Sequence, residues 1–219
     1  MRKRTILLLI ICLICFSFIK YKVEKNITKV PIKWVNDLNK DFSFKDKWSY
    51  PEGIFKNEFG QLSCDSGICL GIEGMKRGDG KILKDSLEAF YKIVDTTHIY
   101  HTLKSTTSVY EWFGSNFINF KKHVDNSIIG KSECHISTHS SLNIIIEDDS
   151  ITAWIDFHSI TNLGRHKFPI KKGEIKIDKQ YFKKGIIKAE FDLTFLNTLD
   201  KDKVIFWKGL IYSNIITNN

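Results

Sequence analysis

Strict alternation over residues 187–195 constrains this chain more than any other sequence feature. In this stretch the apolar residues Ile, Ala, Phe, Leu and Phe alternate with the polar residues Lys, Glu, Asp and Thr. A period of two residues places all the apolar side chains on one face of a β-strand and all the polar ones on the other. The pattern therefore predicts a strand with one buried face and one wet face.

Similar runs recur through the second half of the chain, separated by polar turns. They cover residues 141–147, 151–160, 174–178 and 204–212. Alternation joined by short links favours antiparallel pairing, whereas strands of a parallel α/β sheet would be apolar throughout and joined by helices. The sequence predicts a mainly β fold, either an antiparallel β-sandwich or a lipocalin-like barrel.

One segment in the N-terminal half has a helical period instead. Leu83, Leu87, Phe90 and Val94 follow one another at intervals of four, three and four residues. This spacing places the four side chains on one face of an α-helix. We expect a single helix there, packed on or across the sheet.

The N-terminal sequence predicts the cellular location of the protein. Arg2, Lys3 and Arg4 precede an apolar run of fifteen residues that ends at Ile19. As a helix the run would span about 22 Å, short of the roughly 30 Å hydrocarbon core, and no small-residue cleavage site follows it. Residues 1–20 are therefore either a signal peptide or an uncleaved signal anchor that crosses the membrane. Both predict export to the cell envelope, by a single-pass anchor or as a periplasmic or secreted protein.

The remaining chain divides into a spacer at residues 21–45 and a single globular β-rich domain at 46–219. The net charge of +8 comes from 33 basic and 25 acidic residues, and four of the basic ones lie within residues 1–20. The 29 that remain are an ordinary surplus over 25 acidic residues. No basic cluster interleaved with aromatic residues is present, so we expect no nucleic-acid partner.

Two cysteines enclose a turn-forming tetrapeptide. Cys64 and Cys69 flank Asp-Ser-Gly-Ile. Four intervening residues fit neither the C-x-x-C redox motif nor the usual paired zinc spacing. In an exported protein this pair predicts a structural disulfide.

Four histidines form two close pairs. His98 and His101 are three residues apart, and His135 and His139 are four apart. Either spacing brings two imidazoles to one face of a helix, as a metal site would need, but in a strand it does not bring them together. Solvent-facing or hydrogen-bonded histidines without a cofactor are our primary interpretation, and a metal-dependent enzyme is an alternative.

Tryptophans offer a second alternative. Trp112, Trp154 and Trp207 lie in or near the β segments and would ordinarily pack in the core. Lining a barrel interior, they could instead contact a lipid or another apolar ligand, and the protein would then be a carrier.

Several stretches carry a resemblance. They are Gly173–Asp178, Lys184–Phe195 and Trp207–Ser213 near the C-terminus, and Trp48–Gly53 with Phe59–Cys64 nearer the start. They resemble small exported β-proteins of Bacteroidota-type bacteria, a group without a known activity. The resemblance implies a β fold and export from the cytoplasm. We predict an extracytoplasmic binding or envelope-structural protein without catalytic residues, whose partner is an envelope protein or an apolar ligand.

Overall fold

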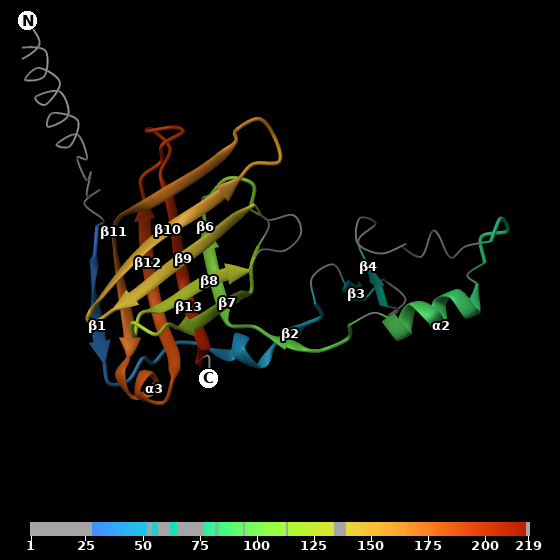
Figure 1. Cartoon of the computed structure of the whole chain (residues 1–219), viewed down its shortest axis with the longest axis horizontal. Helices are drawn as coiled ribbons and strands as arrows, with labels where there is room; N and C mark the ends of the chain where they lie inside the picture. The colour runs from blue at the N-terminus through green and yellow to red at the C-terminus, as the bar shows by residue number, and fades with distance from the viewer. Residues whose placement is uncertain are drawn as a thin grey trace, which may run out of the picture.

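A closed β-barrel dominates the computed structural model, which describes residues 28–51, 54–56, 62–64, 77–81, 83–93, 95–112, 114–133 and 139–217 (Figure 1). Eight strands form the ring in the order β12-β11-β1-β10-β9-β8-β7-β13, with β13 pairing back onto β12, and β6 adds to β13 as an extra strand. The strands are β1 (Val30–Val35), β6 (Leu103–Thr107), β7 (Phe117–Lys122), β8 (Ile128–Glu133), β9 (Ser140–Glu147), β10 (Ser150–His158), β11 (Arg165–Asp178), β12 (Ile186–Phe195) and β13 (Ile205–Thr217). The mainly β prediction is confirmed, and of the two predicted architectures the barrel is the one observed.

Two of the pairings that close the ring are parallel. β1 pairs in parallel with the end of β11, and β13 pairs in parallel with β7 over its last residues. The other ladders are antiparallel, as the alternation predicted. The parallel partners lie far apart in the sequence, so no short hairpin restricts their relative direction.

The barrel interior is filled by its own side chains. The alternating residues of β12 behave as predicted, with Ile187, Ala189 and Leu193 each completely inaccessible to solvent. The largest side chains with less than 2% of their surface exposed are those of Trp207, Phe120, Phe157, Phe168 and Phe191, all within one core cluster. Small barrels are stabilised in this way, by packing rather than by enclosed solvent.

Two glycines permit close contacts in this core. A Cβ atom at Gly130 would overlap the ring of Phe120, which lies directly opposite it on β7. A Cβ atom at Gly209 would overlap the backbone oxygen of Lys104 and lie 2.8 Å from Cα of Ser105 on β6. Glycine is thus required at both positions for the neighbouring group to approach the strand.

The barrel begins within the stretch that the sequence analysis assigned to a spacer. β1 occupies residues 30–35, and its Val30 and Ile32 are buried in the main core. The following residues, including the short helix η1 (Ser43–Asp46), carry a second cluster of Leu38, Phe42 and Phe44. That cluster packs against Leu210 and Tyr212 on β13. This stretch reads as a spacer because its short apolar groups lack a sustained period.

A buried carboxylate connects this second cluster to the barrel. Asp178, 1% exposed, precedes α3 (Lys179–Lys183) and accepts hydrogen bonds from the backbone N–H groups of Gln180 and Tyr181. It also accepts one from Leu38 N–H at 3.1 Å, and Lys188 Nζ lies 3.5 Å away. Burial alone would raise the pKa of Asp178, but these donors and the ammonium together lower it below its ordinary value.

The predicted helix exists as α2 (Lys84–Ile93), but the expectation that it packs on the barrel is wrong. In Figure 1 it lies to one side of the barrel, beyond β2 (Trp48–Ser49), near the hairpin of β3 (Ile54–Lys56) and β4 (Leu62–Cys64). β2 pairs with β5 (Ile99–Tyr100). A closed barrel has no open face that needs a covering helix.

No helix among the described residues is long and apolar enough to cross a membrane. The predicted signal peptide or anchor at residues 1–20 lies outside the described part of the chain.

Candidate ligand-binding site

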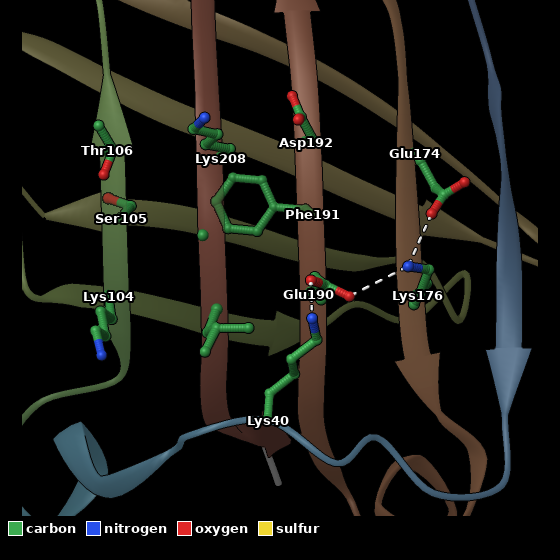
Figure 2. Close-up of a pocket in the computed structure, with 12 residues that line it drawn as sticks. Lys40, Lys104, Ser105, Thr106, Glu174, Lys176, Glu190, Phe191, Asp192 and Lys208 are labelled. Atoms are coloured by element: carbon green, nitrogen blue, oxygen red, sulfur yellow. Dashed lines mark hydrogen bonds and ion pairs between the residues drawn. The ribbon is translucent and has the colours of Figure 1, made fainter.

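Two hollows of similar size lie on the outer surface of the barrel. The first, of about 590 Å³, lies over β6, β13, β12 and β11 and is called here the paired groove (Figure 2). Its charged lining consists of Lys40, Lys104, Glu174, Lys176, Glu190, Asp192 and Lys208. Gly209, whose close approach to β6 is described above, also lines it.

Ion pairs join most of these charges to one another. Glu190 lies between Lys40 and Lys176, with N–O distances of 3.0 and 3.2 Å, and Lys176 also contacts Glu174 at 3.1 Å (Figure 2). The hydrogen bond from Lys40, opposed by partial burial and reinforced by Lys176, lowers the pKa of Glu190. Hydrogen bonds to Glu174 and Glu190 raise the pKa of Lys176. The paired groove therefore neutralises most of its own charge.

The second hollow, of about 610 Å³, lies over the outer face of β8, β9, β10 and β11, and is called here the basic hollow. Cross-strand register assembles it: Asp156 stands opposite both Ser141 and Lys167, and His158 stands opposite Arg165. Its lining residues are Lys131, His139, Ser141, Asp156, Phe157, His158, Arg165, His166 and Lys167. The lining thus contains two lysines, one arginine and three imidazoles but a single carboxylate.

The basic side chains of this hollow have no acidic partners within the described residues. No carboxylate oxygen lies within 4.0 Å of the charged nitrogens of Lys131, Arg165 or Lys167. Lys167 Nζ lies 3.9 Å from the ring centroid of Trp154, and Asp156 accepts a hydrogen bond from Asn143 Nδ2 at 2.9 Å. The positive charge of this surface is therefore available to a ligand.

Backbone hydrogen bonds fix one rim of the basic hollow. His158 N–H donates to the carbonyl of His139 at 2.8 Å, and His139 N–H donates to the carbonyl of Glu111 at 3.1 Å. Glu111 has a φ of 45°, and its carboxylate accepts hydrogen bonds from residues 159–161. Burial alone would raise the pKa of Glu111, but these hydrogen bonds, with the charge of His139, lower it. The carboxylate is thereby held at the turn after β10.

Of the four predicted histidines, the three that the structure describes, His98, His101 and His139, form no shared metal site. The ring of His98 stacks on that of Trp48 with centroids 3.5 Å apart, whereas His101 Nε2 lies 2.7 Å from Ser49 Oγ. His139 belongs to the basic hollow, and His135 lies outside the described residues. The stretch between His98 and His101 is extended as β5, so the pair does not share a helical face. Across the described part of the chain, no three His, Cys, Asp or Glu side chains are placed to hold a metal ion.

The three predicted ligand-contact tryptophans lie in different environments. Trp207 is fully buried and its Nε1 donates to Ser105 Oγ at 2.9 Å. Trp112 packs edge-on against Trp207, with centroids 5.8 Å apart. Trp154 lies on the outer side of β10, beneath Lys167. Of the predicted disulfide pair, Cys64 ends β4 and Cys69 lies outside the described residues, so the disulfide stays a prediction.

Comparison with known proteins adds no assignment. No protein-family model, curated protein or solved structure matches this chain. The resemblance to small exported β-proteins stays a prediction, and function must be inferred from the surface of the barrel.

Sequence reasoning missed most of the basic hollow. It singled out His139 but not Lys131, Arg165 or Lys167, which come from two other strands. The sequence did contain one signal of this site: His158 and Trp154 are four residues apart on one predicted strand, so their side chains lie on the same face of it. Which basic residues lie beside that strand depends on the register of its neighbours, and that register is a tertiary property.

Proposed function

We propose that the protein is an exported binding module that recognises its ligand on the outer surface of the barrel. The observation that supports this most directly is the packing of the interior by its own aromatic side chains, such as Phe168 and Trp207. A ligand held inside would have to displace them, at a cost of several kcal/mol for a large buried ring. The outer surface instead offers two ready hollows.

Export is the second part of the proposal, and the N-terminal segment supports it. Three basic residues before a fifteen-residue apolar run are typical of a segment whose N-terminus stays in the cytoplasm. Residues 1–20 would then either hold the barrel at the membrane or be removed after transport.

A fusion of the full chain to alkaline phosphatase, an enzyme active only outside the cytoplasm, tests export. We expect high phosphatase activity in the fusion. Replacing Arg2, Lys3 and Arg4 by Glu should lower it, because the orientation signal is reversed. The matched control replaces Lys45, Lys47 and Lys56, which lie beyond the leader, by Glu. An inactive wild-type fusion of normal abundance would contradict export.

Native mass spectrometry of the full chain from its own envelope tests the binding surface. We expect a bound species that is lost when Arg165 becomes Glu and retained when the buried Phe168 becomes Leu. The reverse result would place the ligand in the interior and contradict recognition on the outer surface.

A further inference from the structure

We infer that the basic hollow binds an oxyanion, a phosphate or sulfate group carried by a small ligand or by a headgroup. This inference deepens the proposed function, because it names the ligand chemistry of one outer surface. It depends on binding at that surface and not on export.

The positive charge of the basic hollow indicates that its ligand is an anion. Lys131, Arg165 and Lys167 project from β8 and β11 around a single lining carboxylate, Asp156. Guanidinium and ammonium groups recognise oxyanions through charge-assisted hydrogen bonds, and the planar guanidinium can donate two in parallel. Because none of the three is engaged by a carboxylate in the described structure, binding requires no ion pair to break first.

The rest of the lining supplies weaker donors and limits the space. Ser141 lies on β9, His139 lies just before β9, and His158 ends β10. A hollow of about 610 Å³ is in the usual range for a single small ligand. His166 also lines the hollow, and its ring stacks against that of Phe168 with centroids 6.1 Å apart.

Inorganic sulfate is a suitable probe because it is an oxyanion that stays ionised at neutral pH and carries no other chemical group. The full chain would be titrated in uncharged detergent micelles at constant ionic strength, with backbone amide NMR shifts as the readout. We expect shifts in the strands of the basic hollow.

Substitution tests the site. The double variant Arg165→Gln, Lys167→Gln should weaken sulfate binding roughly tenfold. Lys208→Gln is the matched control: it removes one lysine from the outer face of β13 in the paired groove and should leave the affinity unchanged. A second titration replaces sulfate by phosphatidylglycerol in the micelles, with phosphatidylcholine as reference.

Each outcome bears on the inference. Sulfate binding that the double variant loses supports a free oxyanion, and a response only to phosphatidylglycerol, lost in the same variant, supports a headgroup. No response to either probe, or an equal loss in Lys208→Gln, overturns the site. An inactive phosphatase fusion would contradict export without affecting the binding results. The proposal of export and the proposal of an oxyanion site can therefore be rejected independently.

Discussion

The paired groove and the basic hollow share a strand yet differ in charge. The outer face of β11 carries Arg165 and Lys167 in its first half, and Glu174 and Lys176 in its second. The second half pairs with β12, which supplies Glu190, whereas the first half pairs with β10, which supplies only Asp156. The comparison teaches that the neighbouring strand decides the role of a basic side chain on β11. Where that strand supplies a carboxylate partner the side chain forms an ion pair, and where it does not the side chain can bind a ligand. We therefore expect the charged side chains of the paired groove to contribute to folding stability, and those of the basic hollow to contribute to ligand binding.

The largest expected effect is at the floor of the paired groove. Gly209→Ala should lower the free energy of unfolding by about 3 kcal/mol, since the added methyl overlaps the Lys104 backbone oxygen on β6. Urea denaturation measures it. Gly78→Ala, whose Cβ would have no neighbour within 4 Å, is the control and should change little. Equal stability of the two variants would mean that β6 can move away from β13 at little cost.

The next effect is at the buried carboxylate of Asp178. Asp178→Asn should cost about 2 kcal/mol near neutral pH, because Lys188 loses its buried partner. The folded-state pKa of Asp178 lies below its ordinary value, so its contribution is complete above the unfolded pKa. That contribution is lost as the pH falls through the folded pKa, and the two unfolding curves should converge in acid.

Asp37→Asn is the matched control for this position. Asp37 lies 4.0 Å from the same ammonium but its side chain is 81% exposed, so its removal should have little effect at any pH. A wild-type stability curve parallel to that of Asp178→Asn through the acid range would contradict the lowered pKa.

A smaller effect is expected within the ion-pair network. Glu190→Gln should lower stability by about 1 kcal/mol, since it removes the carboxylate between Lys40 and Lys176, and high salt should reduce the difference. Asp192→Asn is on the same face of β12 without an ion pair in the described structure, and serves as control. If both variants unfold alike in thermal scans, the network does not stabilise the groove.

The smallest effect on stability should come from the basic hollow. Arg165→Gln should change the free energy of unfolding by less than about 0.5 kcal/mol, because the exposed guanidinium has no ion pair to lose. The same denaturation measurement checks it. A loss as large as that of Glu190→Gln would erase the difference between the two surfaces.

How far the sequence could predict the fold is clearest from β12 and β1. Nine alternating residues identified β12 with its buried face, because a long period-two pattern has no other favourable structure. β1 escaped notice because six residues with only two buried side chains make too short a pattern. α2 was identified by its spacing, but its position beside the barrel was not, since spacing defines an apolar face and not its partner.

The candidate site was less predictable than the fold. His139 was noticed only as a partner of His135, four residues away, whereas its neighbours in the hollow come from β8, β10 and β11. Local spacing reports contacts along a helix, and in a sheet the contacts run across strands.

By itself, the sequence determined the mainly β class, the buried face of each long strand and the location of the helix. These properties follow from the side-chain period, which is local. Only the tertiary structure decided that the sheet closes into a barrel, that β1 pairs in parallel with β11 and β7 with β13, and that Lys131, Arg165 and Lys167 meet across one hollow. The physical reason is that closure and register depend on pairings between residues distant in the chain, and no local period encodes them.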